Sequence, residues 1–373
     1  MGLEKKRLRL YHKEDETKRG LFMKKERVSV YDWLRLIATI LVVIGHSRYI
    51  SMDATNGGVH YVMPEFTNPA FYSYIVSFFG LMVSYIYSFH MPLFFFLSGA
   101  VLRLKPIKSY DAFCMDKVKR LVVPYFAVGL LFMLPVKFFS GFYTGEGLHL
   151  AYRMFYNGSD SDHLWFLTAL FWCMLLFVAI KKIFERFQVA SEVFLLLVCV
   201  LVQMSAQLIP FDILAMKQGL GYIGWFALGY CFELLRKEKL VKLSVAAKLS
   251  LCLVTGILFV LNIKVGIFED NMNVICGCLF AYFTAEACAI VLRRFESTGC
   301  YKVIMRNLFA IYLFHNPLEF VILKVFMTTT LLATAWGCYL YLFLRIIGVM
   351  IVSVIIGEIV RWIGKCFVKP RSA

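Results

Sequence analysis

The chain is short of charge, and of acidic residues in particular. Only 17% of its 373 residues are charged, and 40 Lys and Arg outnumber 24 Asp and Glu. A soluble domain of this length covers its surface with more polar side chains. Hydrophobic residues instead make up 60% of the chain, and the mean hydropathy is +0.72. This composition argues against a soluble protein and favours a membrane protein.

Several features of other protein classes are missing as well. The 11 cysteines fall in apolar runs or in the strongly basic connections, so we expect no disulfide framework. No Cys and His spacing fits a zinc site, and we expect no metal. The first apolar run lacks a small-x-small cleavage site, which argues against a cleavable signal peptide. Internal repeats and a second soluble domain are not evident.

Apolar runs long enough to cross a membrane recur along the whole chain, and we count ten. Their approximate bounds are 29–50, 73–102, 119–140, 163–180, 191–210, 214–235, 245–263, 271–292, 303–327 and 331–360. The runs are continuously apolar and do not alternate as barrel strands do. The sequence therefore predicts an all-α integral membrane protein with about ten transmembrane helices.

The basic residues predict the orientation of these helices. If the amino terminus is cytoplasmic, 32 of the 40 Lys and Arg fall on that side and 6 on the other. This asymmetry fits the positive-inside rule with both termini cytoplasmic. We predict a basic cytoplasmic tail over 1–27, a ten-helix membrane domain over 28–362 and a second tail over 363–373. The net charge of +16 then reflects topology and contact with membrane lipids, and no nucleic-acid partner is expected.

Ionisable residues lie inside several of the predicted spans. In "RLIATILVVIGH", Arg35 and His46 are eleven residues apart, which is about 20° in azimuth and about 16 Å in height on a helix. They therefore share one helix face, with Arg35 nearer the cytoplasm. Asp32 lies one turn before Arg35 and could pair with it. Two readings stay open here: a functional pair, or a snorkelling arginine and an interfacial histidine.

Three further spans carry buried ionisable groups. His90 precedes Pro92 in the second span, and Arg345 lies near the middle of the tenth. His315 and Glu319 are four residues apart in the ninth, so they can meet on one face. Because such groups are costly in a membrane, four spans that carry them predict a shared polar cavity.

A proton-coupled transporter or exporter of a glycan precursor or small metabolite is the alternative function. It would use the buried His, Arg and Glu, with the glycine-rich sixth span as a broken helix. A non-catalytic scaffold is a third reading. Within the sixth span, "GLGYIG" is interpreted as close helix packing and not as a nucleotide fingerprint. His163, two residues before Trp165, could border the outer mouth of a site, but we favour its interpretation as an interfacial residue.

Five segments together resemble one known family. They are "YDWLRLIATILVVIGHS", "FHMPLFFFLSGAVLR", "KRLVVPY", "HLWFLTAL" and "IYLFHNPL". In this order they are similar to the signature segments of the acyltransferase family three membrane proteins, over about 28–362. The first segment looks closest to the sugar O-acetylase branch related to fucose acetylation.

The resemblance implies a bacterial, multi-pass enzyme of the plasma (inner) membrane. Such enzymes move an acyl group, usually acetyl, from cytoplasmic acyl-coenzyme A to a hydroxyl of a cell-envelope polysaccharide or lipid-linked sugar. By resemblance, His46 is the catalytic histidine and Arg35 its motif partner. The family's Arg-x-x-Arg pair falls on Lys117 and Arg120, where Lys117 keeps the charge but loses the planar fork of arginine.

The residues also make chemical sense in these roles. A neutral imidazole such as that of His46 can take the proton of an attacking hydroxyl. Glu319 could orient an imidazole, and its spacing pairs it with His315. Arg35 could hold part of coenzyme A or neutralise an oxyanion, and Lys117 and Arg120 could hold phosphates. Direct transfer and a covalent relay both stay open, as does the oligomeric state.

Overall fold

The computed structural model describes residues 28–47, 69–107, 109–139, 152–158, 161–189, 191–266, 270–327, 331 and 334–367. Regular structure within these ranges is helical, without strands. Eight helical stretches are long and apolar enough to cross a membrane. They are Ser29–His46, Gly80–Arg103, Tyr110–Phe139, Arg153–Arg186, Val245–Ile263, Met272–Val291, Gly299–Phe326 and Ala335–Cys366. The chain is therefore an all-α integral membrane protein, as its sequence predicts.

The helices of the first half begin with two long elements. They are α2 (Ser29–His46), α3 (Pro69–Arg103), α4 (Tyr110–Lys117), α5 (Val123–Val128), α6 (Leu134–Phe139) and α8 (Trp165–Arg186). Helices α4, α5 and α6 form one rod, joined by π-helical turns at Val118–Val122 and Gly129–Met133. Pro124 and Pro135 follow these turns, and a proline cannot donate to the preceding turn of an α-helix. The wider π turn accommodates each proline without ending the rod.

Two of the ten predicted spans differ from expectation. The fifth is the shorter α9 (Glu192–Ser205), continued to Leu208 by a 3-10 turn. It ends there because Ile209 precedes a proline and is extended. The sixth is divided at Tyr222 into α10 (Met216–Gly221) and α11 (Ile223–Glu238). The Tyr222 ring stacks on Phe95 with centroids 4.7 Å apart, so aromatic packing fills the break.

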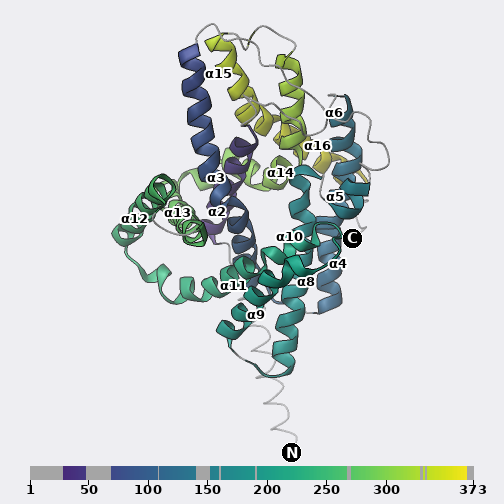
Figure 1. Ribbon diagram of the computed structural model, residues 1–373, viewed down its shortest axis with the longest axis vertical. Coiled ribbons are helices and arrows are strands. Elements are labelled where there is room, and N and C mark those ends of the chain that lie inside the picture. The colour runs from purple at the N-terminus through teal and green to yellow at the C-terminus, as the bar shows by residue number, and fades with distance from the viewer. Residues whose placement is uncertain are drawn as a thin grey trace, which may run out of the picture.

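The second half consists of two helix pairs and a long central helix. The elements are α12 (Val245–Val265), α13 (Asp270–Val291), α14 (Gly299–Met327), α15 (Ala335–Phe343) and α16 (Val349–Phe367). A π-helical turn at Leu344–Gly348 joins α15 to α16 and carries Arg345. In Figure 1, α2 and α3 lie between the α12–α13 pair and the group that contains α4 and α8.

Hydroxyl side chains define where four of these helices begin. Ser109, Ser191, Ser244 and Thr334 each accept a hydrogen bond from the backbone N–H three residues later, at 3.0–3.3 Å. An N-cap hydroxyl satisfies an N–H that has no partner within the helix. The starts of α4, α9, α12 and α15 are therefore fixed by local sequence.

Helix α3 packs closely against α11 through glycine. A Cβ atom on Gly99 would lie 1.9 Å from the carbonyl oxygen of Phe226, and one on Gly229 would lie 1.8 Å from that of Phe96. Only a residue without a Cβ permits this approach. The contact brings the inner face of α3, which also packs on α2 and α13, into the centre of the molecule.

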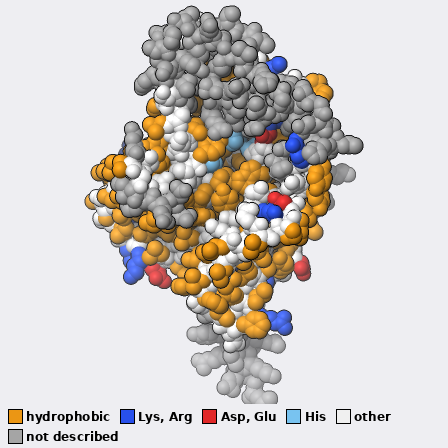
Figure 2. Space-filling view, in the orientation of Figure 1, with side chains coloured by type: hydrophobic (Ala, Val, Ile, Leu, Met, Phe, Trp, Pro, Cys, Tyr) orange, Lys and Arg blue, Asp and Glu red, His pale blue; other side chains and the backbone are white. Residues whose placement is uncertain are grey.

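Large apolar side chains cover the periphery. Leu131, Leu253 and Trp362 are 81%, 66% and 67% exposed. Hydrophobic side chains also cover much of the face shown in Figure 2. In a membrane these side chains face lipid, so the polar groups described next are separated from it by the helices that carry them.

Candidate active site

Three histidines from distant parts of the chain meet inside the molecule. His46 ends α2, His163 lies in the 3-10 turn Asp162–Leu164 ahead of α8, and His315 lies in α14. Their ring centroids are 5.2 Å (His46 to His315), 4.8 Å (His163 to His315) and 6.4 Å (His46 to His163) apart. We call these residues the histidine cluster. Histidine atoms are visible in a hollow on the face shown in Figure 2.

Asn316 contacts the first member of this cluster. Its Nδ2 atom lies 3.3 Å from Nδ1 of His46, and the residue is 2% exposed. Its Oδ1 atom is buried and has no hydrogen-bond partner within the described residues. The side-chain amide therefore lies where it can set the orientation of the His46 ring.

Arg345 anchors the end of α2 on which His46 lies. Its Nη2 atom donates to the carbonyl of His46 at 3.1 Å and to Oε2 of Glu319 at 3.1 Å. Its Nη1 atom donates to the carbonyl of Ser47 at 3.4 Å and to the hydroxyl of Tyr341 at 2.8 Å. The last carbonyls of a helix lack partners within it and carry partial negative charge. A buried guanidinium here stabilises the helix end and fixes the backbone of His46.

A second cation supports the turn that carries His163. Lys137 is 4% exposed, forms an ion pair with Asp162, and its Nζ atom lies 4.2 Å from the ring centroid of Phe320. Asp162 has φ of 46°, in the left-handed region that few residues other than glycine adopt. The ion pair holds this backbone conformation, which places His163 against α14.

The structure brings together four of the residues expected in a polar cavity: His46, His315, Glu319 and Arg345. The pairing of Glu319 with His315 is not found. The Glu319 carboxylate pairs with Arg345, and Nδ1 of His315 lies 2.8 Å from the carbonyl of Tyr312. A carboxylate forms a stronger, charge-assisted hydrogen bond with a guanidinium than with a neutral imidazole, so Glu319 pairs with Arg345 and not with His315.

Other expected site residues lie farther away. Nδ1 of His90 lies 3.0 Å from the carbonyl of Ile86, and its ring contacts Tyr87, whose own ring contacts that of His46. Arg35 is 43% exposed at its side chain and pairs with Asp32 at 3.5 Å, as its spacing predicts. It is three helical turns from His46, about 16 Å along α2. The shared face of Arg35 and His46 therefore does not bring them into contact.

His163 belongs to the histidine cluster, although its local sequence favours an interfacial residue over one that borders a site. Its Nε2 atom lies 3.1 Å from the carbonyl of Leu313, and its own carbonyl accepts from the Tyr312 hydroxyl. Both partners are about 150 residues away in the sequence. The weak signal that could have found His163 is its place in "HLWFLTAL", one of the segments that carry the family resemblance.

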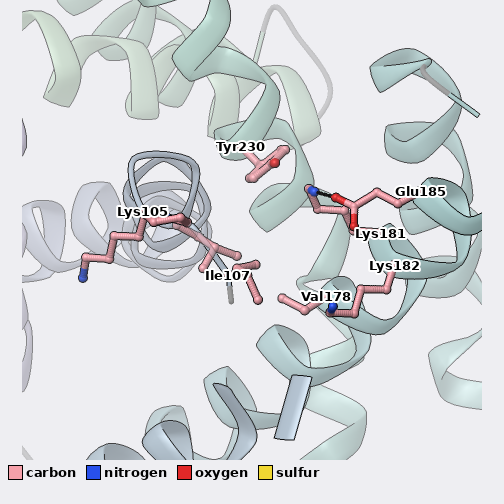
Figure 3. Close-up of a pocket in the computed structure, with 9 residues that line it drawn as sticks. Lys105, Ile107, Val178, Lys181, Lys182, Glu185 and Tyr230 are labelled. Atoms are coloured by element: carbon pink, nitrogen blue, oxygen red, sulfur yellow. Dashed lines mark hydrogen bonds and ion pairs between the residues drawn. The ribbon is translucent and has the colours of Figure 1, made fainter. Parts of the chain in front are cut away.

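A second polar feature lies at the opposite end of α3, on the side predicted to be cytoplasmic. A pocket of about 240 Å³ lies between the end of α3 and the end of α8 (Figure 3). Its lining residues are Leu102, Lys105, Pro106, Ile107, Val178, Lys181, Lys182, Glu185 and Tyr230. Lys181 pairs with Glu185, and Figure 3 shows the Lys105 ammonium directed away from both, so Lys182 gives the lining its net positive charge.

Lys117 and Arg120 do not line this pocket. Both pair with Asp116, at 3.2 Å and 2.7 Å, and the Arg120 side chain is 68% exposed. Among the residues that the structure describes, no group of His, Cys, Asp and Glu is arranged to hold a metal ion.

A buried polar cluster within membrane-crossing helices defines a multi-pass membrane protein with an internal site. The chain matches the family model described as an acyltransferase domain over residues 29–358, nearly its whole length. It therefore belongs to acyltransferase family 3 and is a membrane acyltransferase. Comparisons with curated proteins and with solved structures give no match. The matched range contains the histidine cluster, Arg345 and the lysine-lined pocket.

Proposed function

We propose that the protein transfers an acyl group, namely acetyl, from acyl-coenzyme A to a hydroxyl of a cell-envelope glycan or lipid-linked sugar. His46 is the catalytic histidine in this proposal. The observation that carries it is the histidine cluster, in which His163 and His315 are 5% and 0% exposed inside a membrane acyltransferase. Buried imidazoles in contact with one another are costly in a membrane unless they serve a reaction.

His46 acts as the general base in the proposed reaction. It takes the proton of the acceptor hydroxyl while the hydroxyl oxygen attacks the thioester carbonyl. The C–S bond breaks, the new ester remains on the glycan, and the coenzyme A thiolate leaves with the proton from His46. Arg345 supports this role because it holds the backbone of His46. Asn316 supports it when its amide is rotated so that Oδ1, which has no partner within the described residues, accepts from Nδ1–H of His46 and leaves Nε2 free to take the proton.

The donor enters from the opposite end of the bundle. Lys181 and Lys182, with one carboxylate from Glu185, give the pocket a net positive charge, which suits the phosphates of coenzyme A. Lys117 and Arg120, the family's basic pair by resemblance, and Arg35, expected on chemical grounds to hold part of coenzyme A, lie on the same predicted side. Lysine pairs with phosphate as a point charge, so the pocket does not need the planar fork of arginine.

The separation of the two sites suits a donor with a long arm. Tyr87, whose ring centroid is 6.5 Å from that of His46, and Leu102, which lines the pocket, are fifteen residues apart on α3. This is about 22 Å along a helix. A donor held by its phosphates at the pocket must therefore present its acyl group on a long, narrow arm, as the pantetheine of coenzyme A does.

The transporter alternative has less support. It uses the sixth span as a broken helix, and this span is broken at Tyr222. In transporters such breaks expose backbone groups to the substrate. Here Phe95 stacks on Tyr222, and Gln203 accepts from the N–H of Gly224 at 3.0 Å. The break therefore serves packing, in agreement with our interpretation of "GLGYIG".

The test uses the full chain in nanodiscs with acetyl-coenzyme A and an envelope glycan extract. Release of free coenzyme A thiol is measured for the parent and for His46→Gln. We expect a fall of about 10²–10⁴-fold, the contribution of a general base. His12→Gln, in the predicted cytoplasmic tail, is the control and should match the parent. Equal release by His46→Gln and the parent would refute the role of His46, and acetyl trapped on the parent would indicate a relay.

The pocket is tested separately by Lys182→Ala. Loss of one ammonium group should raise the KM for acetyl-coenzyme A about 3- to 10-fold, with less effect at high ionic strength. Lys302→Ala is the matched control because Lys302 is exposed at the start of α14 on the same predicted side. An unchanged KM in Lys182→Ala would exclude the pocket as the phosphate site.

A further inference from the structure

Two histidines of the cluster, His163 and His315, each have a ring nitrogen to which the proposed role of His46 as general base assigns no function. Nδ1 of His163 and Nε2 of His315 are fully buried and have no hydrogen-bond partner within the described part of the chain. A buried polar atom without a partner costs free energy unless water or a ligand satisfies it. We ask what kind of group these two atoms can bind.

Their backbone contacts fix which nitrogen carries the proton. Nε2 of His163 lies 3.1 Å from the carbonyl of Leu313. Nδ1 of His315 lies 3.1 Å and 2.8 Å from the carbonyls of Ile311 and Tyr312. A carbonyl oxygen only accepts, so each of these nitrogens must donate. In a neutral imidazole the other nitrogen is then an acceptor, which makes both partnerless atoms acceptors.

The two rings are also held in place. Centroids of His163 and His315 are 4.8 Å apart, and the ring of Tyr312 lies 5.4 Å from that of His163. The Tyr312 hydroxyl donates to the carbonyl of His163. The ion pair of Lys137 with Asp162 fixes the preceding turn. Neither ring can turn its acceptor elsewhere without breaking these contacts, so the pair is preorganised.

Two adjacent acceptors require a ligand that donates. A thioester, a carbonyl and a phosphate ester carry no donor, so the reacting end of the acyl donor cannot satisfy them. A polyhydroxylated acceptor can, because each of its hydroxyls donates one hydrogen bond. The pair also lies directly beside His46. The ring centroid of His46 is 5.2 Å from that of His315 and 6.4 Å from that of His163.

We infer that His163 and His315 form the subsite for the glycan acceptor, each accepting a hydrogen bond from one of its hydroxyls. This inference rests on the proposed function and adds to it a residue, His163, that binds the acceptor. The subsite places a sugar hydroxyl within reach of His46. It also selects acceptors with two hydroxyls close together over simple alcohols.

The test compares apparent KM values for both substrates in nanodiscs. Labelled acetyl-coenzyme A is the donor, and an envelope polysaccharide extract, measured by mass concentration, is the acceptor. His163→Phe keeps an aromatic ring but removes Nδ1, the atom that accepts the hydrogen bond. His163→Asn places an oxygen, which can also accept, near the Nδ1 position. We expect His163→Phe to raise the KM for the polysaccharide about 3- to 10-fold with the KM for acetyl-coenzyme A unchanged. His163→Asn should stay within about twofold of the parent.

His315 gives an independent pair of variants should His163→Phe fail to fold. His315→Phe removes the Nε2 acceptor, and His315→Gln restores an oxygen near the same position. An unchanged KM for the polysaccharide in both Phe variants would overturn the inference and assign the two atoms to bound water. A fall in kcat alone would also overturn it. If the parent itself transfers no label to the polysaccharide, the proposed function fails, which is a distinct result.

Discussion

The ion pair between Arg345 and Glu319 makes a quantitative prediction about what holds the site together. Both side chains are buried, at 0% and 1% exposed. Arg345→Met keeps the length of the side chain but removes its charge. The Glu319 carboxylate then stays buried without its partner, and the carbonyls of His46 and Ser47 lose a donor. Removing one member of a buried pair costs about 3–5 kcal/mol.

The double variant Arg345→Met/Glu319→Leu separates the charge from the helix-end contacts. It removes both charges, so only the lost donors to the α2 carbonyls remain, at about 1–3 kcal/mol. We therefore expect the double variant to be more stable than Arg345→Met alone by about 2 kcal/mol. Such a coupling lies within the range found for residues in contact.

Equilibrium unfolding in SDS mixed micelles measures these free energies for the parent, both single variants and the double variant. Arg35→Met is the control, since its pair with Asp32 is partly exposed and should contribute about 1 kcal/mol or less. A loss below about 1 kcal/mol in Arg345→Met would show that the buried pair does not hold the end of α2 in place. So would a double variant that is as unstable as Arg345→Met.

Two further predictions concern the base and the helix packing. Asn316→Leu should lower kcat about 10-fold or more with both KM values unchanged, because His46 loses the side-chain hydrogen bond that orients its ring. Asn316→Asp, whose carboxylate oxygen can accept from Nδ1–H of His46 in place of the rotated amide oxygen, should recover most of the rate, and full activity of Asn316→Leu would argue against this role. Gly99→Ala should lower the free energy of unfolding by about 1–3 kcal/mol or more, because its Cβ would meet the carbonyl of Phe226 at 1.9 Å. Gly80→Ala, in the same helix with nothing within 4 Å, should leave the free energy of unfolding unchanged or raise it by up to about 1 kcal/mol, because alanine is the better helix former. Equal losses in both variants would contradict the packing argument.

Most of the fold could be predicted because it depends on local sequence. Apolar length gives the membrane-crossing helices, and hydroxyl residues give several of their starts. The fifth and sixth spans are less regular than predicted, for reasons that do not appear in a hydropathy averaged over each span. Pro210 ends the first of them early, and the second is broken at Tyr222, whose ring packs on Phe95. Such a break depends on a contact between distant segments.

The site could be predicted only in part for the same reason. The cost of burying ionisable groups pointed to His46, His315, Glu319 and Arg345. Which of them pair is decided across the bundle, as in the contact of Arg345 with the carbonyl of His46. The local spacing of Glu319 and His315 suggested a pairing that the guanidinium prevents.

Transfer of labelled acetyl to glycan is the reaction that we propose for this protein, and it can be measured directly. The parent and His46→Gln, each folded in nanodiscs, are incubated with radiolabelled acetyl-coenzyme A and the envelope polysaccharide, and label is counted in the polysaccharide before and after mild alkali. We expect alkali-labile label with the parent and at least about 100-fold less with His46→Gln. No label in the polysaccharide with the parent, or equal label with both proteins, would contradict it.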